Sequence, residues 1–340
     1  VAWRWLARCW SRCGAWRPAR AETEAMRVLL TGAGGFIGSR LLARLRAAGV
    51  ATRAVSRRPG AALRLADESR VATLTPETDF AALLDGADAV IHLADGFNAW
   101  EHLPPAALHD EAEGRLVTTR RLAAAAARRG VRVIYLSTIK AMCGAQAAHV
   151  LTEASPARPQ SLYGLLKLRA ERAIAEAAET HGSRAVILRF PIVFGRGVGG
   201  NMQRLFRLAA APLPLPLAGI DNRRSLISAA SLITAVEVIV CQPQGPGGVF
   251  LVHDGAMSTP AMFSHVRRAL GRPPLLFAVP RGVWRLAGRL PVAGAMAQRL
   301  AGDLALDDGR LRAAYGWRPA APLEEALADW ARGGFTGQPL

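Results

Sequence analysis

A tyrosine and a lysine four residues apart, Tyr163 and Lys167, form the most reactive pair in this sequence. Residues at this spacing lie on one face of a helix, so the phenol and the ammonium are expected to be neighbours. A free tyrosine has a pKa of about 10 and is a poor base at neutral pH. A neighbouring ammonium favours the phenolate. The pair is predicted to move a hydroxyl proton, and a surface i,i+4 pair is the alternative.

A third candidate group comes from a hydroxyl at the end of an apolar run. Thr138 directly follows the run 131–137, which is predicted to be a strand. The carboxyl ends of parallel strands line the ligand crevice of an open α/β sheet. The Thr138 hydroxyl is therefore expected to hold a substrate oxygen against Tyr163, with Ser137 as the alternative for this role.

A glycine-rich turn, TGAGGFIG at 31–38, joins a predicted strand to a predicted helix. Its three spaced glycines suit a tight turn, close approach of the backbone to a pyrophosphate, and packing of helix on strand. The first N–H groups of the helix would face the anion. This pattern predicts dinucleotide binding, with contacts from Gly32, Gly35, Phe36, Ile37 and Gly38.

The second predicted strand ends in Ser56, Arg57 and Arg58, where an NAD enzyme usually carries an acid for the ribose hydroxyls. Guanidinium groups suit a 2′-phosphate, which favours NADP. If the two arginines are only solvated loop charges, NAD is equally suitable. The predicted cofactor is NAD or NADP, and Lys167 would also hold its nicotinamide ribose while hydride moves to or from the ring.

The elements that must position these groups alternate between strand and helix. Such alternation predicts an α/β fold with a Rossmann-type, doubly wound parallel sheet and helices on both faces. The predicted strands are 27–31, 50–55, 71–74, 89–93, 131–137, 184–190 and 249–253, and the predicted helices are 36–48, 80–84, 105–129 and 161–181.

The chain is predicted to have three parts. Residues 1–25 hold four of the eight tryptophans and are expected to be disordered or an upstream extension, with the biological start at Met26. Residues 26–190 are expected to form the NAD(P)-binding domain that carries the catalytic residues. Residues 191–340, rich in Pro and Gly, are expected to be mainly a smaller substrate-binding region, with some segments returning to the first domain.

Composition narrows the class of partner. The formal net charge is +17, but the arginines are spread along the chain without interleaved aromatics, so nucleic acid is not an expected partner. A basic surface would attract an anionic substrate. The four cysteines form no CxxC pair and have no histidine cluster nearby, so no metal site or disulfide is predicted, and a cytoplasmic location is expected.

No apolar run reaches the roughly 18 residues of a membrane span, so no transmembrane segment is predicted. The apolar stretch 283–306 is interrupted by charges and is expected to be amphipathic and helical. We expect it to pack against the protein core, with weak peripheral membrane contact as the alternative.

Together, TGAGGFIG, ADAVIHLA, LSTIK, YGLLK and YGWRP resemble the extended short-chain dehydrogenase/reductase family, also called the NAD-dependent epimerase/dehydratase family. The resemblance runs from about Met26 to about Trp330. The stretches PETDF, LPLPLAGIDNRRSL and FLVHDGAMSTP resemble a narrower branch. That branch contains UDP-glucose 4-epimerase-like proteins and 4-ketoreductases that make N-acetylquinovosamine-type sugars for bacterial surface polysaccharides.

The resemblance implies roles for individual residues. It implies that Thr138, Tyr163 and Lys167 are catalytic and that Asn201 and Arg224 bind a nucleotide sugar, with the Arg224 guanidinium on the pyrophosphate. Relatives often dimerise through two helices, so a homodimer through 105–129 and 161–181 is expected. Further cofactor contacts are implied for His92, Leu93, Ala94, Phe190, Pro191 and Ile192.

Three positions depart from the family pattern. Glu111 stands where an Asn of an NVxGT motif is usual, and Thr73 stands where an acid contacts adenine. Asp95 ends His-Leu-Ala-Asp where His-Leu-Ala-Ala is usual, and it places a carboxylate near the cofactor. A non-catalytic, dinucleotide-sensing pseudoenzyme is therefore the alternative of another class.

The residues after Thr138 discriminate between reactions. Nucleotide-sugar dehydratases carry an Asp-Glu pair there, whereas this chain has Ile139 and Lys140, so dehydration is not expected. Two reactions remain open: epimerisation at C4 of a UDP-sugar through a 4-keto species, and NADPH-dependent reduction of a UDP-4-keto-6-deoxy-N-acetylhexosamine. Both use the same three residues. Tightly bound NAD would indicate the epimerase, and exchangeable NADPH the reductase.

Overall fold

The computed structural model describes residues 26–95, 105–279 and 300–333. The predicted extension at 1–25 and most of the predicted amphipathic stretch 283–306 lie outside these ranges. Within them, no helix has the length and apolar character needed to cross a bilayer.

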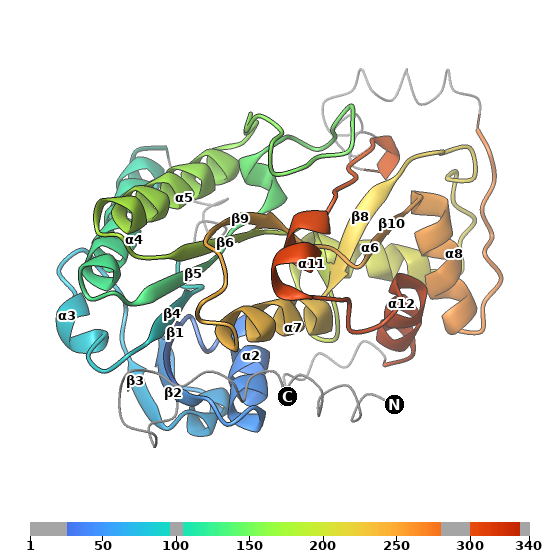
Figure 1. Cartoon of the computed structure of the whole chain (residues 1–340). Helices are drawn as coiled ribbons and strands as arrows, with labels where there is room; N and C mark the ends of the chain where they lie inside the picture. The colour runs from blue at the N-terminus through green and yellow to red at the C-terminus, as the bar shows by residue number, and fades with distance from the viewer. Residues whose placement is uncertain (1–25, 96–104, 280–299, 334–340) are drawn as a thin grey trace.

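A seven-stranded parallel sheet forms the centre of the larger lobe, which confirms the predicted fold class (Figure 1). Its strand order is β3-β2-β1-β4-β5-β6-β9. Successive strands are thus added on one side of β1 up to β3 and on the other side from β4 onward, which creates a topological switch point beside β1. The strands are β1 (Arg27–Thr31), β2 (Ala51–Ser56), β3 (Glu68–Val71), β4 (Ala89–His92), β5 (Arg132–Leu136), β6 (Ala185–Arg189) and β9 (Gly248–Leu251).

Both faces of the sheet are covered by helices because its central strands are apolar on both sides. In β1, Val28 and Leu30 pack in the core on the α2 and α7 side, whereas Leu29 packs in the core on the α3, α4 and α5 side. Side chains alternate between faces along a strand, so neighbouring residues supply two separate cores. The helices are α2 (Phe36–Ala47), α3 (Phe80–Leu83), α4 (Pro105–Arg128), α5 (Leu162–Thr180) and α7 (Ala229–Val240).

One predicted strand was misplaced. The prediction was 71–74, but the strand β3 covers Glu68–Val71 and continues the parallel register from Arg53 opposite Glu68. All four β3 residues are exposed at the sheet edge, so burial did not select apolar side chains there. Thr73 consequently lies in the segment that follows β3.

In the described residues, a second, smaller lobe contains the three-stranded sheet β10-β8-β7 with helices packed beside it (Figure 1). Its core joins Phe194, Phe206, Phe263 and Trp330. The elements are β7 (Val193–Phe194), β8 (Arg224–Ser228), β10 (Gly255–Met257), α6 (Gly200–Ala210), α8 (Thr259–Ala269) and α12 (Leu323–Arg332).

Two segments beyond residue 190 also join the large sheet. The strand β9 pairs with β6, and α7 packs against α2. The helix α11 (Gly309–Tyr315) contacts β9, where the Tyr315 and Phe250 rings meet edge to face at a centroid distance of 5.5 Å. The chain therefore passes between the two lobes more than once.

Candidate active site

The carboxyl ends of four adjacent strands bring the predicted site residues to one edge of the sheet. Thr31 ends β1, His92 ends β4, Thr138 follows β5 and Phe190 follows β6. The backbone N–H of Ile139 donates to the Phe190 carbonyl, which ties two of these ends together. This edge is where open α/β sheets bind their ligands.

Thr138 and Tyr163 meet because a helix packs directly on a short 3₁₀ turn. Thr138 caps the turn η2 (Ile139–Ala141) and accepts from the Lys140 N–H at 3.2 Å. A Cβ on Gly164 would collide with the Lys140 carbonyl, so only glycine allows α5 to lie this close. The Thr138 side chain consequently lies near the Tyr163 hydroxyl and lowers the pKa of that phenol.

The alternative hydroxyl, Ser137, points elsewhere. It donates to the carboxylate of Glu171, which also forms a buried ion pair with Arg189. Ser137, Glu171 and Arg189 thus join β5, α5 and β6 into one network of satisfied polar groups. Thr138, and not Ser137, is the hydroxyl that faces Tyr163.

Lys167 lies one helical turn after Tyr163 and is buried. Its Nζ donates to the Leu136 carbonyl at 2.8 Å and to the Asp95 carboxylate at 2.5 Å. The same nitrogen lies 6.0 Å from the centre of the Tyr163 ring. The predicted Tyr–Lys face therefore exists, but the ammonium is already paired with an acid.

Opposing charges act on the phenol. Burial raises the pKa of Tyr163, the Lys167 ammonium and the hydrogen bond from Thr138 lower it, and the Asp95 carboxylate raises it. The combined effect leaves the pKa of Tyr163 above its ordinary value. Asp95 thus offsets part of the activation that the Tyr–Lys spacing predicts.

Tyr135 is a site residue that the sequence analysis did not identify. Its hydroxyl donates to the Asp95 carboxylate at 2.6 Å, and its ring centre lies 4.8 Å from the Lys167 nitrogen. Burial, together with the neighbouring Asp95 carboxylate, raises the pKa of Tyr135 well above its ordinary value. The alternation of side chains along a strand could have identified Tyr135. In β5, Val133 and Tyr135 are two residues apart and share the face on which α5 packs.

The glycine turn has the shape that a dinucleotide pyrophosphate requires. Gly35 caps α2 without any side-chain hydrogen bond, and no acid lies in the first helical turn. A Cβ on Gly38 would collide with the Gly32 carbonyl. No side-chain cap or acid therefore competes with an anion for the first N–H groups of α2, and the backbone of the turn at Gly32 packs directly on the helix at Gly38. The residues present therefore fit NAD or NADP.

The other predicted cofactor residues surround this turn. The N–H groups of Leu93 and Ala94 donate to the Thr31 hydroxyl, which fixes the segment after β4 beside the glycines. Arg57 and Arg58 are exposed beyond β2. The remaining predicted contacts are part of the described structure, with Phe36 and Ile37 in the first turn of α2 and Phe190, Pro191 and Ile192 directly after β6.

His92 is held between two hydroxyls. Its Nδ1 lies 2.8 Å from the Thr31 Oγ1 and its Nε2 lies 3.1 Å from the Thr119 Oγ1. Burial lowers the pKa of His92 to about 4, although Asp95 acts in the opposite direction. The imidazole is therefore neutral at physiological pH.

This neutral histidine predicts acid sensitivity of the fold. Below about pH 6.5 the unfolded chain binds a proton at His92 that the folded chain binds only near pH 4. The free energy of unfolding should therefore fall by about 3 kcal/mol from this residue alone as the pH drops through that window. Urea unfolding at pH 7 and near pH 4 should show a smaller loss for His92→Gln than for the wild type. Equal losses in the two proteins would contradict the assignment.

The two predicted substrate residues belong to elements of the smaller lobe. The Arg224 guanidinium donates to the carbonyls of Gly302 at 2.5 Å and Ala145 at 3.2 Å, and burial lowers its pKa. Its predicted pyrophosphate contact stays a prediction. Asn201 lies in α6, but its side chain is outside the described part of the structure.

The positions that depart from the family pattern are also located. Glu111 pairs with Arg115 one turn later on α4. Ile139 is buried, and the Lys140 Nζ donates to the Gly144 carbonyl at 2.6 Å. Across residues 26–95, 105–279 and 300–333, no three metal-ligating side chains come together.

Comparison with known proteins gives a consistent picture. Residues 28–252 match the family described as the NAD dependent epimerase/dehydratase family. The chain is 30% identical to a UDP-glucose 4-epimerase of Vibrio cholerae, over 90% of this chain and 94% of that protein. It is 27% identical to a UDP-glucose 4-epimerase of Azospirillum brasilense, over 86% of this chain and 87% of that protein.

A solved structure shares the fold at lower sequence identity. The UDP-N-acetylglucosamine 4-epimerase of Bacillus cereus superposes with a TM-score of 0.70 at 20% identity. The match covers 91% of this chain and 100% of the other.

Proposed function

The chain belongs to the NAD-dependent epimerase/dehydratase family, and on that basis we propose that it inverts C4 of a UDP-sugar through a 4-keto species. Family membership makes the chain an NAD(P)-dependent enzyme and not a non-catalytic sensor of dinucleotides. The convergence of Thr138, Tyr163 and the Lys167 ammonium at the carboxyl end of β5 is the observation that carries the proposal.

Each residue has a task in this reaction. NAD, when bound at the glycine turn, supplies reversible hydride transfer. Tyr163 as phenolate accepts the proton of the C4 hydroxyl, while Thr138 hydrogen-bonds the same oxygen and holds it in place. Lys167 stabilises the phenolate by its positive charge. Once the keto sugar has rotated so that its other face is presented, hydride would return to C4 while Tyr163 returns the proton to the C4 oxygen, and the opposite configuration results.

The nucleotide-binding end of the sugar would lie toward the smaller lobe. Arg224 begins β8 in that lobe, and its guanidinium reaches across to Ala145, which follows the turn after Thr138. A guanidinium at this place suits bidentate hydrogen bonding to a phosphate. We propose that the UDP pyrophosphate exchanges for the two backbone carbonyls that Arg224 now contacts.

A second reaction is favoured by a different observation. Arg57 and Arg58 follow β2 and are exposed, where a 2′-phosphate would be placed. Exchangeable NADPH and a single hydride transfer would make the protein a 4-ketoreductase of a UDP-4-keto-6-deoxy-N-acetylhexosamine. The site chemistry at Thr138, Tyr163 and Lys167 would be the same.

One experiment separates these two reactions. The purified protein is denatured and the released nucleotide identified, and the intact protein is assayed with UDP-glucose, UDP-galactose and UDP-N-acetylglucosamine without added cofactor. We expect co-purified NAD and formation of the C4 epimer. A protein that is empty, inactive on these sugars and able to reduce the 4-keto sugar with NADPH would overturn the epimerase.

A matched double variant tests the arginines independently. Arg57→Ser with Arg58→Ser should leave NAD-dependent turnover unchanged if the enzyme is an epimerase. In a ketoreductase, the KM for NADPH should rise while the KM for NADH stays the same, because the variants remove only the 2′-phosphate contacts.

A further inference from the structure

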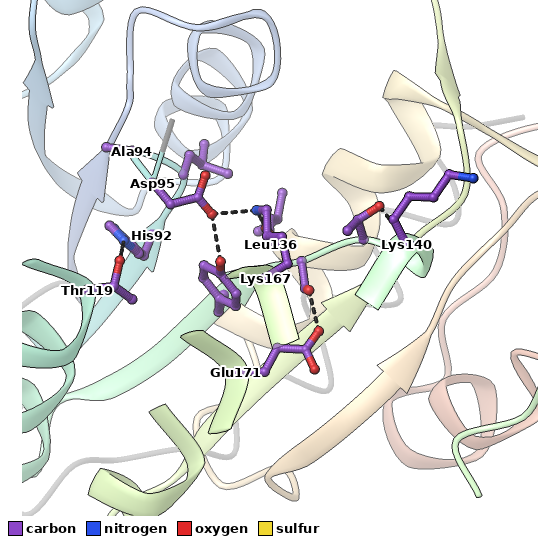
Figure 2. A network of polar contacts seen from close by, with 12 residues as sticks. His92, Ala94, Asp95, Thr119, Leu136, Lys140, Lys167 and Glu171 are labelled. Atoms are coloured by element: carbon purple, nitrogen blue, oxygen red, sulfur yellow. Dashed lines mark hydrogen bonds and ion pairs between the residues drawn. The ribbon is translucent and has the colours of Figure 1, made fainter. Parts of the chain in front are cut away.

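Asp95 is a buried acid that the proposed reaction does not use. It follows β4, and its Oδ2 accepts from both the Lys167 Nζ at 2.5 Å and the Tyr135 hydroxyl at 2.6 Å (Figure 2). The Lys167 and Asp95 side chains are only 7% and 8% exposed. A pair this far from water interacts strongly, because solvent screens it little.

None of the other titratable groups described next to the Lys167–Asp95 pair competes with Asp95 for the charge of the Lys167 ammonium. His92 on β4 is neutral at physiological pH, and Tyr135 on β5 resists ionisation. Glu171, one turn further along α5, is balanced by the guanidinium of Arg189. Within the part of the chain that the structure describes, Asp95 is thus the acid that directly neutralises the Lys167 ammonium.

We propose that Asp95 is a positioning residue, whose carboxylate, fixed by Tyr135, anchors the Lys167 ammonium and limits the positive charge felt by Tyr163. This inference rests on the proposed proton transfer by Tyr163. Without Asp95, the ammonium keeps its bond to the Leu136 carbonyl and its place over the Tyr135 ring, and it acts on the phenol without the opposing charge of Asp95. The wild-type enzyme would therefore form its phenolate only at a higher pH than the Tyr–Lys pair alone would allow.

The phenolate can be observed directly, because the chain has three tyrosines. The ultraviolet absorbance of tyrosinate is followed during a pH titration of the protein as purified, with any nucleotide that it carries. Subtracting the titration of Tyr163→Phe from that of the wild type isolates Tyr163. The same subtraction is made in the Asp95→Asn background. We expect Tyr163 to titrate about one pH unit lower with Asp95→Asn, since a facing negative charge has been removed.

Two further variants control for structural damage. Asp95→Ala restores the alanine that is usual for the family at this position and serves if Asp95→Asn does not fold. Tyr135→Phe removes the hydroxyl that holds Asp95 but keeps the carboxylate charge. It should shift the Tyr163 titration less than either substitution of Asp95. Circular dichroism at each pH checks that the proteins remain folded during the titration.

The titration needs no substrate, so its outcome is separate from that of the proposed function. If UDP-sugars are turned over, the acid limb of the kcat profile should move to lower pH in the Asp95 variants, in parallel with the absorbance. A lowered titration without any turnover would retain the role of Asp95 and reject the UDP-sugar reaction. A Tyr163 titration that is unchanged or raised in the folded Asp95 variants would overturn the inference.

Discussion

Tyr163→Phe should lower kcat by about 10²–10⁴-fold while leaving the bound nucleotide in place. The substitution removes only the hydroxyl that exchanges a proton with the sugar, and the Lys167–Asp95 pair keeps its geometry. The KM for the UDP-sugar should change little, because the phenyl ring of the variant still fills the place of the phenol. Steady-state kinetics and the nucleotide released on denaturation provide both readouts.

Tyr315→Phe is the matched control for this substitution. Tyr315 is buried and hydrogen-bonded, to Arg132 and to the Pro246 carbonyl, but it lies on α11 near the amino ends of β5 and β9, whereas the candidate site lies at the carboxyl ends. Its loss should cost about 1–3 kcal/mol of stability through the polar groups left without a partner. It should leave kcat unchanged. If Tyr163→Phe kept nearly full turnover, the assignment of Tyr163 as the proton-transfer group would be wrong.

Lys167→Met should both abolish turnover and destabilise the protein by about 3–5 kcal/mol. The substitution leaves the Asp95 carboxylate buried without its cation, which is costly in a site with little access to water. It also removes the charge that stabilises the Tyr163 phenolate. Urea unfolding and steady-state kinetics measure the two effects separately.

The double variant Lys167→Met with Asp95→Asn distinguishes the two effects. Removing both charges should restore most of the stability, because an amide can still accept from Tyr135. It should restore none of the turnover. Arg332→Met, which breaks the exposed pair with Asp329, is the surface control and should cost less than about 1 kcal/mol. Equal destabilisation by the single and the double variant would contradict the proposed ion-pair energetics.

Local geometry explains why much of the fold and part of the site were predictable. The four-residue spacing of Tyr163 and Lys167 places them on one face of α5 wherever that helix lies. The glycine turn after β1 and the apolar strands followed by helices likewise follow from backbone conformation and side-chain periodicity. These signals involve residues that are close together in the chain, and they predicted the sheet and the Tyr–Lys pair.

The exposed edge could not be placed in this way. The strand β3 reads ESRV and has no buried face, so hydrophobic periodicity carried no information about its position. Its location is set by pairing with β2, which is a property of the assembled sheet.

The amino-acid order alone thus specified the groups able to transfer a proton and the turn able to receive a dinucleotide. Folding determined the charge around them, since Asp95 and Lys167 are 72 positions apart and Tyr135 joins them from a third element. Arg224 likewise reaches Gly302 and Ala145 only through the packing of the two lobes. Burial and long-range pairing determine the strength of a charge, and neither is encoded in the local spacing of residues.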